Sequence, residues 1–289
     1  MTAETLAILS LDDDGHGRTA SGEAFPMTVP GDRVVVDGDG RVTLIDPSPQ
    51  RATPPCPLFG QCGGCSHQHL SDTLYADWMV GRVERAFARK GLTPPIKDLV
   101  RSPLAARRRV TLTAERTGEG IRVGYTQSRS HTVVDVTQCP AMAPPLAACL
   151  PALRTLAADA AGASGSARLT ATLCANGVDA ALTTPKPKPK KGRTKRRPDA
   201  RPPPLATASD AIIRIALNGE TLLQRDTPVV RFDGVDVPLP PGAFLQATRE
   251  GEDGLIKAVR EGVGTALRVA DCFSGLGTFA APLSRTASV

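Results

Sequence analysis

Three cysteines stand within ten residues of one another in a glycine-rich stretch, and a fourth follows far downstream. The stretch reads Cys-Pro-Leu-Phe-Gly-Gln-Cys-Gly-Gly-Cys and places thiols at Cys56, Cys62 and Cys65. Cys139 is followed by Pro, as Cys56 is, a feature shared with the ligand run of bacterial ferredoxins. Glycines at positions 60, 63 and 64 allow left-handed backbone, so the loop can wrap around a bound group. The pattern predicts that these thiolates hold a metal centre.

Two kinds of metal centre suit this set of ligands. A 4Fe–4S cluster takes four cysteine thiolates, whereas zinc takes any four nitrogen or sulfur ligands in a tetrahedral arrangement. The candidates for a zinc set are Cys56, Cys62 and Cys65 with His67, His69 or Cys139. The spacing of the cysteines by itself leaves both kinds of centre open.

The length of the chain and its number of cysteines limit the classes of protein to which it can belong. A chain of 289 residues is long enough for two or three domains. It has no apolar run of about 18 residues, the length that spans a membrane, and its first residues do not form a signal peptide. Seven cysteines without an export signal argue against a disulfide framework. We therefore expect a cytoplasmic protein without membrane association, and a monomer by default.

The basic charge of the chain is concentrated in one segment. Residues 185–204 contain nine Lys or Arg and a single Asp, so their local charge is +8 and the rest of the chain carries −2 of the net +6. This segment has almost no apolar residue to bury, which predicts a disordered insertion. It could add salt-sensitive affinity for RNA, or it could be a solvated insertion without a binding role.

The residues before the insertion predict two domains of different kinds. Residues 1–50 alternate short β-like runs with turns, which is typical of a small β-barrel of the oligonucleotide-binding type. Residues 51–235 predict an α+β domain that carries the cysteines. It begins with a helix from Ser71 to Arg89 around the single tryptophan, Trp78, which we expect to be a core anchor. A β-meander over 107–137 follows, opened by three arginines that could reach phosphates or be merely solvated.

Further elements of this central domain have clear local patterns. An Ala- and Leu-rich stretch predicts a helix over 146–161, and Asn176-Gly177 between two apolar runs predicts a hairpin, since these residues tolerate positive φ angles. Cys149 and Cys174 fall within these elements and Cys272 within a later strand, so all three are interpreted as small buried side chains.

The last part of the chain, 236–289, has the pattern of a nucleotide-type α/β fold. Pro-Pro-Gly-Ala-Phe-Leu-Gln leads into a helix predicted from Arg249 to Glu261. An apolar run over 266–271 predicts a buried strand that ends in Asp271, and Cys-Phe-Ser-Gly-Leu-Gly-Thr follows it. Glycines at the carboxyl end of such a strand let the backbone approach a ligand closely.

Taken together, these motifs resemble one family. The order of β-barrel, Cys-x5-Cys-x2-Cys, distant Cys-Pro, Phe-x-Gln and Asp-x-Phe-x-Gly-x-Gly is similar to that of the iron–sulfur-containing RNA (uracil-5-)-methyltransferases. These are class I S-adenosylmethionine-dependent enzymes of the 23S rRNA 5-methyluridine type. The resemblance implies a TRAM-like RNA-binding barrel, the α+β cluster domain and the start of a Rossmann-like methyltransferase domain. It covers the chain except for the basic insertion.

The resemblance also assigns roles to particular residues. It implies that Cys56, Cys62, Cys65 and Cys139 bind a 4Fe–4S cluster, which it favours over zinc. It implies that S-adenosylmethionine contacts Gln246, Phe273 and Thr278, with Gly275 and Gly277 in the same loop. Thr248 stands where the family usually has Asn, and Ser274 where it commonly has Cys. The implied substrate is RNA, with rRNA favoured over tRNA.

The family reaction uses a cysteine thiolate that adds to uracil C6 and a base that later removes the C5 proton. The resemblance places this nucleophile, this base and the acidic residue for the cofactor ribose after Val289, so we expect a chain truncated within its catalytic domain that is inactive by itself. The alternative is a catalytically inactive RNA-binding fragment with a structural iron–sulfur or zinc site. A zinc-stabilised RNA-binding module unrelated to methylation is a third reading.

Overall fold

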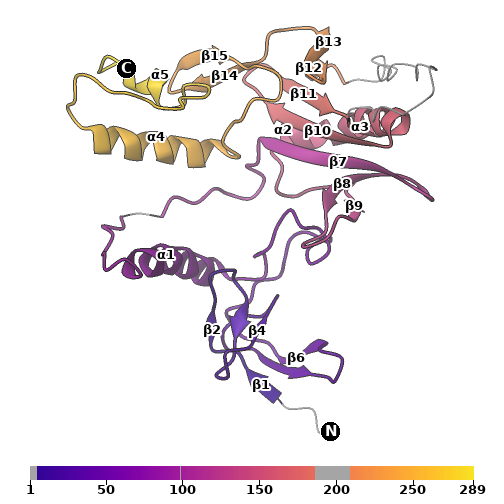
Figure 1. Ribbon diagram of the computed structural model, residues 1–289, viewed down its shortest axis with the longest axis vertical. Helices are drawn as coiled ribbons and strands as arrows, with labels where there is room; N and C mark the ends of the chain where they lie inside the picture. Colours follow the sequence, from indigo (N-terminus) through magenta and orange to yellow (C-terminus); the bar gives the residue numbers. More distant parts are fainter. Residues whose placement is uncertain (1–4, 98, 186–208) are drawn as a thin grey trace, which may run out of the picture. The chain divides into compact units, whose positions relative to one another are not determined.

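The computed structural model describes residues 5–97, 99–185 and 209–289 (Figure 1). The chain divides into two compact units, Met1–Leu99 and Val100–Val289. This division is coarser than the three parts expected from the sequence, whose boundaries stay predictions. Apart from Pro185, the basic segment 185–204 lies outside the described residues.

The N-terminal unit contains the short strands that its turn-rich sequence predicted. In its described part they form two three-stranded antiparallel sheets, with strand orders β1-β5-β6 and β2-β3-β4. The strands are β1 (Thr5–Ala7), β2 (Ser10–Leu11), β3 (Gly17–Arg18), β4 (Ala24–Phe25), β5 (Arg33–Val36) and β6 (Val42–Asp46). Asp32, fully buried, accepts hydrogen bonds from the backbone N–H groups of Val29 and Ser48 and pairs with Arg51 at 2.7 Å. Its carboxylate thus joins the turn before β5 to the stretch from Ser48 to Arg51.

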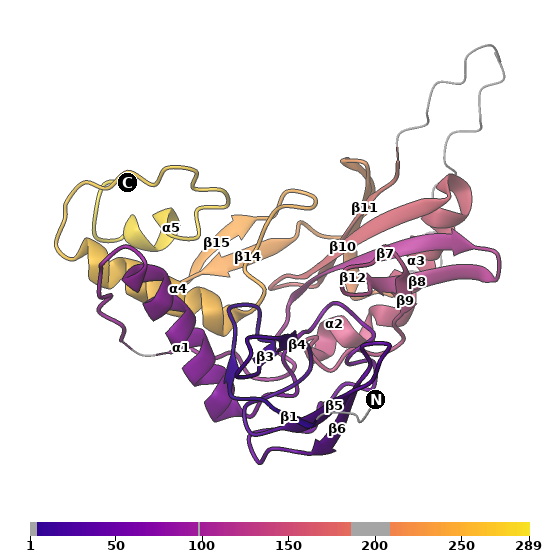
Figure 2. The same cartoon turned by 60° about the horizontal axis from the view of Figure 1, so that its bottom comes forward.

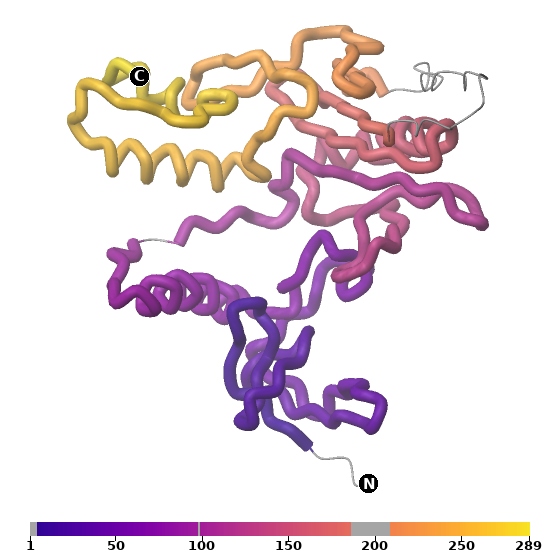
Figure 3. The backbone as a smooth tube through the Cα atoms, in the orientation of Figure 1, coloured from indigo at the N-terminus to yellow at the C-terminus, as the bar shows by residue number. Residues whose placement is uncertain are grey.

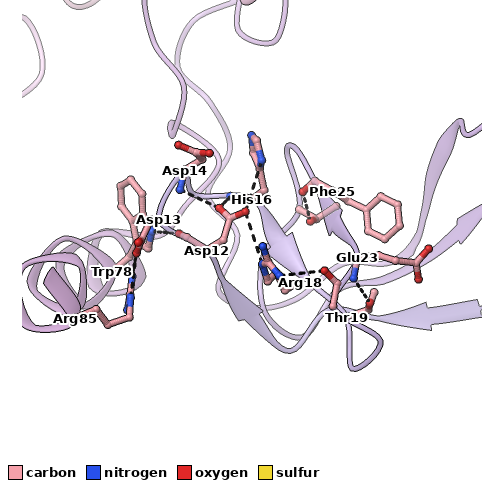
Figure 4. Close-up of polar contacts among 12 residues, drawn as sticks. Asp12, Asp13, Asp14, His16, Arg18, Thr19, Glu23, Phe25, Trp78 and Arg85 are labelled. Atoms are coloured by element: carbon pink, nitrogen blue, oxygen red, sulfur yellow. Dashed lines mark hydrogen bonds and ion pairs between the residues drawn. The ribbon is translucent and has the colours of Figure 1, made fainter. Parts of the chain in front are cut away.

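Helix α1 (Asp72–Ala88) completes this unit and confirms the helix predicted from the sequence. The side chain of Ser71 accepts a hydrogen bond from the N–H of Leu74, as a serine N-cap does. Trp78 is buried in a small cluster with Val29 and Leu70, which confirms its prediction as a core anchor. Figure 4 shows its indole next to the turn that carries Asp12.

The second unit is built on a mixed seven-stranded sheet with the order β13-β12-β11-β10-β7-β8-β9. All neighbouring pairs are antiparallel except β11 and β12. The β-meander and the hairpin at Asn176-Gly177 are both present, as predicted. The strands are β7 (Arg109–Thr117), β8 (Gly120–Thr126), β9 (Val133–Asp135), β10 (Ser166–Leu173), β11 (Val178–Thr183), β12 (Ile212–Leu217) and β13 (Glu220–Gln224).

Two consecutive helices pack on this sheet and form the main core with it (Figure 2). They are α2 (Pro144–Ala148) and α3 (Leu150–Ser164), which divide the single helix predicted over 146–161. The side of α3 that carries Leu153, Leu156 and Ala160 is buried against β7, β8 and β10. Apolar residues at this three- and four-residue spacing lie on one face of a helix, which explains the packing.

The end of the chain adds a hairpin and two helices to the second unit. Strands β14 (Val229–Phe232) and β15 (Val235–Pro238) pair antiparallel, α4 (Arg249–Val263) follows, and α5 (Ala280–Leu283) is a single short turn. Figure 3 traces the backbone from α4 through an irregular stretch to α5. Among the described residues, none of the helices combines the length and the apolar character needed to cross a membrane.

Candidate functional site

The predicted cofactor residue Gln246 lies in a segment, Pro240 to Thr248, that joins β15 to α4 without regular secondary structure. Helix α4 begins after Thr248, whose side-chain oxygen accepts a hydrogen bond from the N–H of Gly251. Threonine and asparagine both serve as N-caps. The departure from the family's Asn at this position therefore preserves the start of the helix.

Arg108, the residue immediately before β7, is hydrogen-bonded to the Gln246 segment. Its backbone N–H donates to the carbonyl of Ala247 at 2.8 Å, and its Nε donates to the carbonyl of Gln246 at 3.1 Å. Its Nη2 lies 2.5 Å from Oε2 of Glu252 in the first turn of α4. The side chains of both charged residues are buried, so the pair is shielded from solvent.

The loop over 271–278 contains the other predicted cofactor residues. The carboxylate of Asp271 accepts a hydrogen bond from the N–H of Ala280 at 3.1 Å and closes the loop. Gly275 and Gly277 have φ angles of 58° and 79°, which favour glycine. Phe273 has a φ of 64° although it carries a side chain, and its relative exposure of 105% means that its ring touches almost nothing. This loop therefore carries a solvent-exposed aromatic ring close in sequence to two glycines.

The Gln246 segment and this loop meet on one apolar cluster. Leu245, next to Gln246, is buried with Val230, Phe232 and Leu239, and Leu276, between the two glycines, packs against the same cluster. The residues predicted to contact S-adenosylmethionine therefore come from two segments that share one support. The structure brings these segments together, although they are about thirty residues apart in the sequence.

The strand predicted over 266–271 is not formed, and this prediction was wrong. The only ladder contact in this stretch among the described residues is an isolated bridge between Arg268 and Ser288, and Leu267 is exposed. A parallel strand of an α/β fold is buried because neighbouring strands and helices cover it. Here the described residues supply only that one bridge.

The three cysteines interpreted as buried side chains divide into two groups. Cys149 and Cys174 are buried, as predicted, whereas Cys272 is exposed because the predicted strand around it is absent. Burial raises the pKa of Cys149, and burial with the charge of Asp179 raises the pKa of Cys174 to about 12. Neither buried thiol is poised to act as a nucleophile, since the thiolate is the reactive form.

The cysteine-rich loop belongs to the N-terminal unit. Cys56, Cys62 and Cys65 are half-buried, and the N–H of Gly64 donates to the sulfur of Cys62 at 3.4 Å. Cys139 is also half-buried and belongs to the second unit. The thiol chemistry of this set suits an iron–sulfur cluster or zinc. Within the ranges that the structure describes, however, no group of three or more His, Cys, Asp or Glu side chains is placed to hold a metal ion.

The glycines of this loop do not all have the left-handed backbone conformation that the sequence allowed them. Only Gly60 has a positive φ angle, 86°, whereas Gly63 and Gly64 do not. The two histidines considered for zinc have other surroundings. His67 contacts the carbonyl of Asp14 and lies 4.5 Å from the Trp78 ring, and burial lowers the pKa of His69 to about 4.

Sequence reasoning missed the role of the arginines at 107–109. Arg108 is buried and paired with Glu252, so it is neither a phosphate contact nor a solvated side chain. Arg109 lies over the ring of Phe244 at 5.6 Å. The sequence shows a run of three arginines before a predicted strand. It does not show that Arg108 pairs with Glu252, because Glu252 is distant in the chain and no local pattern connects the two residues.

Comparisons with known proteins identify relatives of this chain. No family model matches it. An uncharacterised RNA methyltransferase of Rhizobium meliloti is 38% identical over 297 residues, which cover 99% of this chain and 70% of the relative. An uncharacterised RNA methyltransferase of Caulobacter vibrioides is 37% identical, with the same coverage. The 23S rRNA (uracil(1939)-C(5))-methyltransferase RlmD of Pectobacterium atrosepticum is 29% identical over 85% of this chain and 55% of its own length.

A solved structure shows the same fold. The tRNA (uracil-54, C5)-methyltransferase of Pyrococcus abyssi, in complex with S-adenosyl-L-homocysteine, matches 99% of this chain and 71% of its own with a TM-score of 0.70 and 19% identity. The mixed sheet and the additional β-sheets of this chain thus form the same fold as that Pyrococcus protein. The similarity to the Rhizobium and Caulobacter proteins shows that the chain belongs to the RNA methyltransferase family.

Proposed function

We propose that this protein acts in the transfer of a methyl group from S-adenosylmethionine to C5 of a uracil in RNA. The first candidate for the RNA substrate is 23S rRNA. The observation that carries the proposal is the shared support of the Gln246 segment and the Phe273–Thr278 loop on one apolar cluster. We assign these two segments to the wall of the cofactor site, as the resemblance of their motifs implies. The names of the Pectobacterium and Pyrococcus proteins favour uracil C5 as the acceptor.

The described residues suit particular parts of the cofactor. The exposed ring of Phe273 offers a flat apolar face on which an adenine base can stack. Gly275 and Gly277 lack side chains, so that the chain can approach the cofactor closely. Gln246 offers an amide that can both donate and accept hydrogen bonds. Thr278, half-buried after the second glycine, offers a hydroxyl at the same loop.

The chemical step follows from the electronic structure of uracil. A cysteine thiolate adds to C6 and makes C5 enolate-like, C5 takes the methyl group from the sulfonium, a base removes the C5 proton, and the thiolate leaves. The atoms balance, with S-adenosylhomocysteine and one proton as the other products. Cys149 and Cys174 are excluded as the nucleophile by burial and raised pKa.

The direct test is cofactor binding. Isothermal titration with S-adenosylhomocysteine should give a measurable Kd for the wild type, and Phe273→Ala should raise that Kd about tenfold. Leu267→Ala is the matched control, since Leu267 is also exposed and near in sequence but outside the loop. Methylation of 23S rRNA by the full-length enzyme, followed by nucleoside mass spectrometry, should yield 5-methyluridine. No binding by the wild type, or another methylated nucleoside, would refute the proposal.

We also propose that Cys56, Cys62, Cys65 and Cys139 hold a 4Fe–4S cluster with a structural role. The support is chemical: cysteine thiolates are the ligands of such a cluster, and an N–H donor contacts the sulfur of Cys62. Iron and acid-labile sulfide should be present in anaerobically purified protein and be lost in Cys62→Ser but not in Cys272→Ser. Zinc without iron would replace this assignment with the zinc alternative.

A further inference from the structure

The Gln246 segment has no secondary structure to hold its shape. Between Pro238, the last residue of β15, and Arg249, the first of α4, its backbone makes no strand or helix pairing. Its conformation must therefore come from contacts with other parts of the second unit. Two buried ion pairs supply such contacts, one near each end of the segment.

The first ion pair acts at the C-terminal end. Arg108 donates from its backbone to the carbonyl of Ala247 and from its guanidinium to the carbonyl of Gln246, two successive carbonyls of the segment. The same guanidinium pairs with Glu252, and the two side chains are only 7% and 1% exposed. A planar guanidinium presents donors in fixed directions, so it can fix a carbonyl and a carboxylate together.

The second ion pair acts near the start of the segment. Asp179 on β11 pairs with Arg214 on the parallel neighbour β12 at 2.7 Å, with side-chain exposures of 1% and 7%. Burial raises the pKa of Asp179, and the side chain of Arg214 and the nearby backbone N–H of Gly242 oppose that rise. Gly242 has a φ of 70°, and a side chain added there would touch Ala181 on β11. The segment thus packs directly on the sheet here.

Stability alone does not explain two buried pairs at this place. Desolvation of both charges often cancels their attraction, and apolar replacements of the same size are often neutral or stabilising. Oε1 of Glu252, Oδ2 of Asp179 and Nη2 of Arg214 also have no hydrogen-bond partner, which adds to the cost. What the Arg108–Glu252 pair supplies, and apolar side chains cannot, is a guanidinium whose donors point at the main chain of the segment.

We propose that Arg108 is a positioning residue that sets the conformation of the Gln246 segment for cofactor binding, with the Asp179–Arg214 pair as the second anchor. This inference rests on the proposed function, because it assigns the purpose of the anchored segment to the cofactor. Arg108 acts through the main chain of Gln246 and Ala247 and does not itself touch the cofactor.

The test compares Arg108→Lys with Leu156→Ala. Lysine keeps the charge next to Glu252 but loses the planar fork, whereas Leu156 is buried in α3, so its truncation destabilises the same unit without touching the segment. Limited digestion with chymotrypsin reports local opening, since Phe244 within the segment is exposed but its neighbour Leu245 is buried. Cleavage after Phe87 on the exposed face of α1 is the internal reference.

At a temperature where both variants are folded, Arg108→Lys should raise cleavage after Phe244 about tenfold relative to cleavage after Phe87, and Leu156→Ala should not. The Kd for S-adenosylhomocysteine should rise by a similar factor only in Arg108→Lys. Unchanged cleavage in folded Arg108→Lys would overturn the inference whether or not the protein binds the cofactor, and absence of binding by the wild type would refute the proposed function alone. Where Arg108→Lys does not fold, Asp179→Asn takes its place with the same criterion.

Discussion

The indole Nε1 of Trp78 donates a 2.7 Å hydrogen bond to the backbone carbonyl of Asp12 (Figure 4). This contact joins helix α1 to the turn between β2 and β3, and the Trp78 ring packs on Val29 and Leu70 beneath it. The guanidinium of Arg82 covers the ring at 4.9 Å from its centroid. Trp78 therefore connects the helix of the N-terminal unit to the β2–β3 turn, beside the pair of Arg85 with Asp13.

Replacement of Trp78 by Phe should lower the free energy of unfolding by about 2 kcal/mol, because it removes the donor to Asp12 and leaves part of the cluster unfilled. Urea unfolding followed by circular dichroism measures this change. Arg82→Ala, which loses only the cation–π contact, should cost about 0.5 kcal/mol. Equal losses in the two variants would contradict the anchoring role of Trp78.

Asp32→Asn should destabilise the N-terminal unit by about 3 kcal/mol, since it leaves Arg51 without its buried partner and weakens two bonds to backbone N–H groups. Asp37 is the matched control, because it accepts from the N–H groups of Asp39 and Arg41 in an exposed turn. Asp37→Asn should cost about 0.5 kcal/mol or less. The measurement is again the free energy of unfolding in urea.

The thiols should differ sharply in reactivity. Burial raises the pKa of Cys174 to about 12, so very little of this thiol is ionised at pH 8, and burial blocks the reagent as well. Iodoacetamide at pH 8, followed by peptide mass spectrometry, should label the exposed Cys272 and leave Cys174 unmodified. S-adenosylhomocysteine should slow the labelling of Cys272, because this cysteine lies in the proposed cofactor loop. Rapid labelling of Cys174 in the folded protein would contradict its burial.

Glu252 should make stability depend on pH in a particular direction. Burial raises its pKa, although the charge of Arg108 and its hydrogen bond oppose the rise. A carboxyl with a raised folded-state pKa contributes stability below its unfolded pKa of about 4.3, and this contribution is lost as the pH rises through the folded value. The unfolding free energy of the wild type minus that of Glu252→Gln should therefore fall as the pH rises from 4. A difference that grows with pH would show that Arg108 outweighs burial.

Local patterns predicted most of the secondary structure. The helix after Ser71 is confirmed because an N-cap and apolar spacing act within a few residues. The hairpin at Asn176-Gly177 is also confirmed, but for a partly different reason. Gly177 has the positive φ angle, whereas Asn176 does not and instead bonds through its side chain to Asp226, Thr227 and Val229. Asn176, which predicted the turn by its local propensity, thus forms hydrogen bonds to residues about fifty positions away.

The sequence predicted which residues form the candidate site, but not the contacts that hold those residues in place. The sequence pointed to Gln246 and to the loop from Phe273 to Thr278 through their motifs. It did not indicate that Arg108 would bond to the Gln246 carbonyl, since the two residues are 138 positions apart. It also predicted a buried strand over 266–271 from an apolar run, and an apolar run does not state whether other strands are present to cover it.

By itself, the sequence determined the order of motifs, the concentration of basic charge in 185–204 and the local starts and ends of helices, because these depend on residues near one another in the chain. Only the tertiary structure decided that Arg108 is buried against Glu252, that Cys272 is exposed while Cys174 is not, and that the two cofactor segments share one apolar cluster. Burial and ion pairing depend on which distant segments the fold brings together, and no local pattern carries that information.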